Sequence, residues 1–199
     1  MKILLIANST ASSVTARKRV VIAKLLSGAH DVSVALTERR GHATELARAA
    51  IVDGVDIVVA LGGDGTLNEV ANGLVGSDCA LAVLPGGSTN VLARTLGLAD
   101  DPVQACLQLL DALDLGLIRR VSLGRVDALT PLEPGSDLGG RGPASTITEA
   151  PRWFTFHLGI GWDAATVAAV ERRGALKRYL NHVLFIYAGI RKFGFRYFK

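Results

Sequence analysis

The chain has 199 residues, with 22 basic side chains, 18 acidic side chains and 49% apolar residues. This length exceeds one average domain and falls short of two, and it can bury a core without disulfide or metal cross-links. Low charge and aperiodic glycine exclude disordered, collagen-like and coiled-coil chains. Two cysteines, Cys79 and Cys106, exclude a disulfide-rich secreted scaffold and favour a cytoplasmic protein.

The basic charge is confined to one end of the chain. Residues 171–199 carry eight basic side chains and one acidic one, a net of +7, whereas the first 170 residues have a net charge of −3. This distribution argues against nucleic acid as the partner of the whole domain. No apolar run reaches the ~20 residues that a transmembrane helix needs. Residues 179–190 form an apolar stripe with basic flanks, for which packing in a core is favoured over lying on an anionic membrane surface.

Apolar runs alternate with helical patterns over the first 113 residues. Strands are predicted at 2–7, 32–36, 55–61 and 79–84, and helices up to residue 26 and at 44–52, 66–74, 89–96 and 102–113. Such alternation predicts an α/β fold, a doubly wound parallel sheet with helices on both faces. The nearly continuous apolar character of the strands fits burial on both sides.

The pattern changes after residue 114. Strands are predicted at 117–129 and 153–158, a Gly/Pro/Ser-rich loop at 131–151, and helices at 163–172 and 176–192. We therefore expect a nucleotide-binding domain at 1–115. The rest, 116–199, reads as the unfinished start of a β-rich second domain.

The motif GGDGTLNE, residues 62–69, follows an apolar strand and opens a helix. Its glycines allow backbone amides to approach an anion closely. Thr66 and Glu69 have the spacing of a capping box, which would define a helix start that favours phosphate. Asp64 would repel a phosphate unless it serves a metal, a sugar hydroxyl or a proton. A simple strand–helix turn with Asp64 on the surface is the less favoured interpretation.

A second glycine-rich turn, PGGSTN at residues 85–90, follows the next strand. Its Ser, Thr and Asn side chains can cap a helix or donate to a phosphate. Beside the first turn, it predicts the second wall of one nucleotide site. No Gly-Lys-Ser/Thr sequence supports a P-loop. The G-x-G-x-x-A match at 159–164 lies late in the chain and is interpreted as a packing turn, and the four histidines lack metal-ligand spacing.

Together the two turns resemble a known family. Two segments are similar to motifs of the diacylglycerol kinase catalytic domain: GGDGT followed by NE at 62–69, and GSTN followed by AR at 87–94. That family includes bacterial lipid kinases and sphingosine and ceramide kinases, with NAD kinase and phosphofructokinase as more distant relatives of the fold. Residues 37–43 and 159–164 resemble further segments of the same family. The resemblance therefore covers essentially the whole chain.

The resemblance implies ATP and Mg²⁺ as cofactors, with Asp64 at the catalytic position and Asp64 or Glu69 at the metal. The residues it implies for ATP binding are Asn8, Ser9, Thr10, Ala11, Ser12, Thr37, Gly62, Gly63, Asp64, Gly65, Thr66, Leu67, Asn68, Glu69, Gly87, Ser88 and Asn90. Two departures concern phosphate contact. Ser9 and Ser12 stand where the family has proline and glycine, and Ser88 replaces threonine but keeps the hydroxyl.

The resemblance implies an ATP-dependent lipid kinase at the inner membrane face, with a diacylglycerol or sphingoid-type acceptor. The family's general base belongs to an Asp-Gly-Glu-like segment that this sequence does not contain. We therefore expect a chain truncated within its second domain. An NAD kinase-like enzyme and a catalytically silent nucleotide-binding fragment stay open as alternatives. The lipid and the oligomeric state, a homodimer included, are also open.

Overall fold

The computed structural model describes residues 1–8, 11, 14–127, 129–131, 145–147 and 151–158. The chain forms two compact units, Met1–Phe156 and His157–Lys199. The turn expected at 159–164 and the helices expected at 163–172 and 176–192 lie outside the described residues, and so does the basic tail.

Four parallel strands alternate with helices in the first unit, in the sheet order β2–β1–β3–β4. The strands are β1 (Lys2–Asn8), β2 (Asp31–Thr37), β3 (Ile57–Gly62) and β4 (Ala80–Pro85), and the helices are α1 (Ala16–Ser27), α2 (His42–Val52), α3 (Asp64–Leu74), α4 (Val91–Thr95) and α5 (Pro102–Asp114). All three neighbouring strand pairs are parallel. The predicted α/β fold is therefore confirmed.

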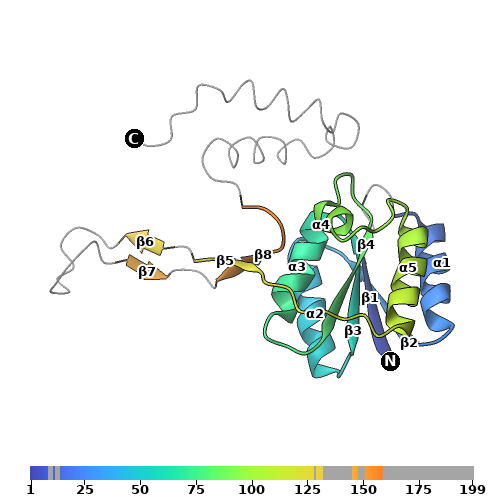
Figure 1. Ribbon diagram of the computed structural model, residues 1–199. Helices are drawn as coiled ribbons and strands as arrows, with labels where there is room; N and C mark the ends of the chain where they lie inside the picture. The colour runs from blue at the N-terminus through green and yellow to red at the C-terminus, as the bar shows by residue number, and fades with distance from the viewer. Residues whose placement is uncertain (9–10, 12–13, 128, 132–144, 148–150, 159–199) are drawn as a thin grey trace, which may run out of the picture. The chain divides into compact units, whose positions relative to one another are not determined.

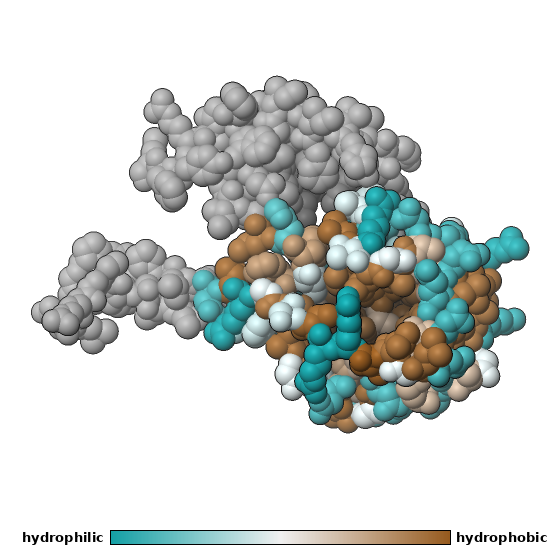
Figure 2. Space-filling model, in the orientation of Figure 1, coloured by the Kyte–Doolittle hydropathy of each residue, from teal (hydrophilic) through white to brown (hydrophobic). Residues whose placement is uncertain are grey.

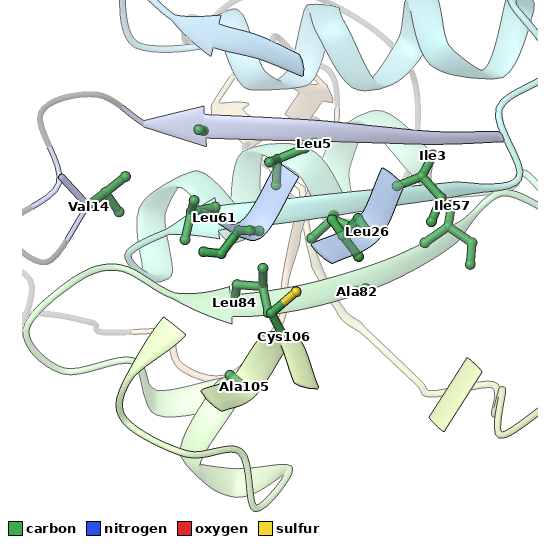
Figure 3. Close-up of a cluster of buried hydrophobic side chains, with 13 residues drawn as sticks. Ile3, Leu5, Val14, Leu26, Ile57, Leu61, Ala82, Leu84, Ala105 and Cys106 are labelled. Atoms are coloured by element: carbon green, nitrogen blue, oxygen red, sulfur yellow. The ribbon is translucent and has the colours of Figure 1, made fainter. Parts of the chain in front are cut away.

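Helices cover both faces of this sheet, α1 and α5 on one face and α2 and α3 on the other (Figure 1). Each face has its own cluster of buried apolar side chains. Every residue of β3 is buried, which explains its uninterrupted apolar sequence. In Figure 3, Leu5, Leu61 and Leu84 from three strands lie in one cluster with Cys106 of α5. Burial raises the pKa of the Cys106 thiol to about 11, as fits a cysteine that serves packing.

Side-chain caps define where α1 and α5 begin. The Thr15 hydroxyl accepts a hydrogen bond from the Lys18 amide, and the Asp101 carboxylate accepts from the Val103 amide at 2.8 Å. Pro102 occupies the first turn of α5, where its missing N–H costs nothing. The Lys18 ammonium lies 2.8 Å from the Asp101 carboxylate, so one ion pair joins the starts of the two helices.

Helix α3 begins two residues earlier than predicted, at Asp64, with Gly63 as its N-cap. Thr66 is then the third helical residue, and Thr66 and Glu69 do not form the expected capping box. α4 also begins later than predicted, at Val91, because Asn90 before it has a left-handed backbone with φ 47°.

The described elements after α5 are short strands in antiparallel pairs. β5 (Gly124–Val126) pairs with β8 (Arg152–Phe154), and β6 (Leu129–Pro131) with β7 (Ser145–Ile147). Part of the loop expected at 131–151 is thus strand, and the strand expected at 153–158 ends at Phe154.

The strand predicted at 117–129 is wrong over 117–123. These residues pair with no described strand, and the side chains of Leu117, Ile118 and Val121 are exposed. Alternating apolar residues do not form a strand without a neighbour to complete the hydrogen-bond ladder. The domain boundary after residue 115 stays a prediction, since the first compact unit continues to Phe156.

The surface of the described residues mixes hydrophilic and hydrophobic side chains on the face shown in Figure 2. Among these residues, no helix combines the length and the apolar character that crossing a lipid bilayer requires.

Candidate nucleotide-binding site

The carboxyl ends of the four parallel strands meet at one edge of the sheet, where open α/β sheets bind ligands. Asn8 of β1 lies opposite Thr37 of β2, and Gly62 of β3 lies opposite Pro85 of β4. The edge thus brings together four of the predicted segments. Of the loop after β1, the structure describes Ala11, whose amide donates to the Asn8 carbonyl at 3.2 Å, while the predicted residues 9, 10 and 12 lie outside the described part.

The two glycine turns pack directly against each other through their backbones. The Gly86 amide donates to the Gly62 carbonyl at 2.8 Å. A Cβ atom at Gly87 would lie 2.7 Å from the Gly63 Cα, and one at Gly86 would lie 2.9 Å from the Gly62 Cα. Glycine is therefore needed here for close contact between the turns themselves, a reason that the sequence motifs did not reveal.

The start of α3 is suited to an anion. The first amides of a helix have no partner inside the helix, and its dipole favours negative charge there. Gly63, the N-cap, has no side chain to satisfy these amides. Gly65 is exposed and has open space beside it, and Ser88 of the second turn is exposed as well. The amides at the start of α3 and the exposed Ser88 hydroxyl, which we call the phosphate surface, are groups that can bind a phosphate.

Asp64 is half-buried and connects the first turn to α4. Its Oδ1 accepts a hydrogen bond from the Val91 amide at 2.7 Å. Burial raises the pKa of the Asp64 carboxyl, and hydrogen bonds from backbone amides at the start of α4 partly oppose this effect. Asp64 therefore stabilises the arrangement of the two turns, and it is not the free surface residue of the less favoured interpretation.

The Asn90 side chain stabilises the second turn through hydrogen bonds to the backbone of the same turn. Its side chain is only 7% exposed, its Oδ1 accepts from the Gly87 amide at 2.9 Å, and its Nδ2 donates to the Gly87 carbonyl at 2.9 Å. A narrow gap, too small to admit a water molecule, lies between the turns and is lined by Gly62, Gly63, Asp64, Leu67, Val83, Pro85, Asn90 and Ala93. Asn90 thus contributes to the framework of the two turns by holding the shape of the second one.

Two other motif residues connect α3 to neighbouring elements. The Asn8 amide group donates to the Thr66 hydroxyl at 3.0 Å, which joins β1 to α3. The Glu69 carboxylate accepts from the Ala43 amide at 3.3 Å, and the Thr44 hydroxyl donates to the Glu69 carbonyl at 2.8 Å. Glu69 therefore caps α2, where its negative charge also interacts favourably with the positive end of the helix dipole.

The two carboxylates expected at Mg²⁺ thus have different partners, Asp64 at α4 and Glu69 at α2. The described part of the chain contains no group of three His, Cys, Asp or Glu side chains that could hold a metal ion. Mg²⁺ bound with a nucleotide commonly takes one or two carboxylates and completes its coordination with phosphates and water. Asp64, the first residue of α3, supplies such a carboxylate beside the helix amides that are suited to phosphate.

Two asparagines on α3 hold strand β8. The Asn68 Oδ1 accepts from the Thr155 amide at 3.2 Å. The Asn72 Oδ1 accepts from the Trp153 amide at 2.9 Å, and its Nδ2 donates to the Trp153 carbonyl at 2.8 Å. Asn68 was predicted to contribute to ATP binding. Asn72 was not among the predicted functional residues. The spacing of four residues, which places both amides on one helix face, was the available signal.

The chain matches known proteins over the region that contains this site. The model of the diacylglycerol kinase catalytic domain matches residues 2–126. A diacylglycerol kinase of Bacillus subtilis (strain 168) is 37% identical over 109 residues, which cover 54% of this chain and 35% of the relative. A protein of Klebsiella pneumoniae (strain 342) named probable lipid kinase YegS-like is 36% identical over 134 residues, covering 65% and 42%. The chain thus spans less than half the length of these relatives.

A solved structure agrees with these sequence matches. The crystal structure of a diacylglycerol kinase from Bacillus anthracis str. Sterne superposes with a TM-score of 0.52 at 28% sequence identity, over 66% of this chain and 46% of that one. The family model covers more than half of the 199 residues and includes both glycine turns. The chain therefore belongs to the diacylglycerol kinase catalytic domain family.

Proposed function

We propose that this chain forms the nucleotide-binding part of an ATP-dependent lipid kinase, which transfers the γ-phosphate of ATP to a lipid hydroxyl. The observation that carries the proposal is the packing of two glycine turns against each other beside the start of α3. Phosphoryl transfer depends mainly on positioning the phosphates and neutralising their charge. A rigid pair of turns next to a helix N-terminus serves the first requirement.

In this proposal the phosphates lie over the first amides of α3, near Gly65 and the exposed Ser88 hydroxyl. Asn8 and Thr37, at the ends of β1 and β2, lie along the same edge and are assigned to the remainder of the nucleotide. Mg²⁺ supplies charge neutralisation when it binds with ATP. We assign its protein contact to Asp64, and we give Glu69 the capping role that its contact with α2 supports.

Family membership supports the proposed acceptor. The proposed substrate is a diacylglycerol or sphingoid-type lipid, reached at a membrane surface. No described residue is assigned the role of general base, and the transfer activity of the whole protein is part of the proposal.

Calorimetric titration of the chain with MgATP tests the phosphate position. Gly65→Glu and Gly65→Gln form a matched pair, because the two side chains are nearly equal in size and differ in charge, and Gly65 has open space beside it. Two like charges ~5 Å apart near a protein surface repel by several kcal/mol, so we expect Gly65→Glu to weaken MgATP binding about tenfold or more relative to Gly65→Gln. Equal affinities for the two variants would contradict the placement.

Transfer of radiolabelled phosphate distinguishes the acceptors. Diacylglycerol, sphingosine and NAD are offered in parallel reactions with labelled ATP. Label in a lipid supports the proposal, and label in NAD alone overturns it. MgATP binding without transfer to any acceptor would identify the 199-residue chain as a nucleotide-binding unit without activity of its own.

A further inference from the structure

The hydrogen bonds between α3 and β8 have the form of a strand pairing. Asn72 uses its amide oxygen and its amide nitrogen to bind the N–H and the C=O of one residue, Trp153. It thereby takes the place of a neighbouring strand, since no described strand pairs with β8 on this side. Asn68, one turn earlier, accepts from the Thr155 amide. Three consecutive bonds along the chain thus set the register of β8 on the helix.

Among the described residues, few other contacts hold the strand pair that contains β8 in its position. β5 and β8 have three residues each, and a two-stranded pair of this size is marginal by itself. The Phe154 ring lies against Gly124, where glycine leaves room for it. The Arg125 guanidinium lies 5.8 Å from the centroid of the Trp153 ring. Trp153 is therefore held through its ring by Arg125 and through its backbone by Asn72.

The same helix carries the phosphate surface at its other end. Asn72 lies eight residues after Asp64, a distance of ~12 Å along the helix at 1.5 Å per residue. The intervening turns are anchored in the core by Leu67 and Val70, which keeps the two ends of the helix in a fixed relation to each other.

We infer that Asn72 is a positioning residue, which holds β8 in a fixed place relative to the phosphate surface at the start of α3. The inference rests on the proposed function, because it gives α3 two ligands, a phosphate at its N-terminus and a strand at its side. An anion bound at the first amides of α3 stabilises the helix that carries Asn72, and we expect it to strengthen the Asn72–Trp153 contact. By reciprocity, a well-placed β8 favours the anion.

Amide hydrogen exchange of the full 199-residue chain, measured residue by residue by NMR, tests this role. In Asn72→Ala the Trp153 amide loses its own acceptor, but the Thr155 amide keeps Asn68. Loss of two hydrogen bonds shifts the docking equilibrium of β8 by about tenfold, so we expect exchange at Thr155 to rise about tenfold. Unchanged exchange at Thr155 would show that Asn72 makes a local bond only, and it would overturn the inference.

Two controls accompany this variant. The amides of Val58 and Val59 in the buried strand β3 report whether the sheet stays folded. Asn72→Ala also removes the bond from Asn72 Nδ2 to the Asn68 carbonyl at 2.8 Å within α3, and the higher helix propensity of alanine offsets this loss. Asn68→Ala is the second control, because it removes only the longer bonds to Thr155. We expect a smaller rise in exchange at Trp153 in this variant than the rise at Thr155 in Asn72→Ala.

Saturating MgATP tests the link to the phosphate surface. We expect it to slow exchange at Trp153 and Thr155 about fivefold in the unmodified chain and to have no such effect in Asn72→Ala. If calorimetry shows binding and exchange does not change, the link is refuted while the proposed function stands. If MgATP does not bind, the proposed function and the link fail together, and exchange at Thr155 without nucleotide still decides the role of Asn72.

Discussion

The four-stranded sheet and the β5–β8 pair are stabilised by different interactions. The sheet has strands of six or seven residues, and apolar clusters cover both its faces. The β5–β8 pair has three residues in each strand and partly exposed side chains, and two asparagine amides hold it to α3. Burial of apolar area tolerates small changes of geometry, whereas a few directional hydrogen bonds do not. The stability of the four-stranded sheet is therefore insensitive to small changes of geometry. The β5–β8 pair has a well-defined position on α3, but few interactions stabilise it there.

Helix α3 belongs to both regions. Its buried face contributes Leu67, Val70 and Leu74 to the core. Its polar residues contact other elements, Asp64 at α4 and Asn72 at β8. The motif that suggested nucleotide binding thus also holds together the structure around the site, and substitutions in it are expected to affect both stability and binding.

Truncation of a core residue should have the largest effect on stability. Leu5 is 0% exposed, so Leu5→Ala is expected to lower the free energy of unfolding by about 2–5 kcal/mol, through lost burial and the cavity left behind. Urea denaturation followed by circular dichroism measures the change. Val20→Ala is the control, since Val20 is 56% exposed and should alter stability by no more than ~0.5 kcal/mol. Equal effects would contradict the assignment of the core.

Crowding the two glycine turns should have the next largest effect. A Cβ at Gly87 would lie 2.7 Å from the Gly63 Cα, so Gly87→Ala is expected to cost about 1–3 kcal/mol and to weaken MgATP binding. Gly65→Ala, which meets open space within α3, should instead be neutral or stabilising by up to ~1 kcal/mol. Thermal unfolding compares the two variants. A stable Gly87→Ala protein would show that the turns can separate freely.

Two substitutions of Asp64 distinguish the role of its hydrogen bond from the role of its negative charge. Asp64→Ala removes the acceptor of the Val91 amide and is expected to cost ~1 kcal/mol, whereas Asp64→Asn keeps an acceptor oxygen there. Both should weaken MgATP binding if the carboxylate contacts the metal. Chemical denaturation and calorimetry on the same samples distinguish the roles, and unchanged affinity in Asp64→Asn would contradict the metal contact.

The pH dependence of stability gives a second test of Asp64. Its pKa in the folded chain is raised by burial, so the folded state keeps the proton to a higher pH than the unfolded state does. The contribution of Asp64 to stability therefore falls as the pH rises from the ordinary aspartate pKa through the raised folded value. Asp64→Asn lacks this fall. As the pH rises through this range, the unmodified chain should therefore lose stability relative to Asp64→Asn. A constant difference in unfolding free energy between the two proteins would contradict the raised pKa.

The smallest effect is expected in the β5–β8 pair. In Gly124→Ala the new methyl group displaces the Phe154 ring, which changes the surroundings of Trp153 while the sheet stays intact. With Trp162→Phe in the background, the emission of Trp153 is the only tryptophan signal and should shift, with little change in the unfolding temperature. In a Phe154→Ala background the same substitution should have no effect, as a double-mutant cycle would show. A large loss of stability would mean that this pair supports the sheet.

Local patterns in the sequence were sufficient for the α/β fold. The four sheet strands and α5 begin and end within two residues of their predicted bounds, because their apolar periodicity and their turn residues are properties of neighbouring positions. The order of the two glycine turns, each after a strand, was also sufficient to place them at one edge, since parallel strands all end on the same side.

Tertiary structure alone decided the partners of the motif residues. Asp64 meets Val91 across 27 positions, Glu69 meets Ala43 across 26, and Asn72 meets Trp153 across 81. No local pattern specifies such partners, because a hydrogen bond depends on where whole elements pack. For the same reason the sequence predicted a strand at 117–123 that is absent from the fold, since a strand exists only beside another strand. Local sequence patterns thus specify the elements of the sheet and the edge at which the proposed ligand site lies, and packing specifies the partner of each polar side chain at that edge.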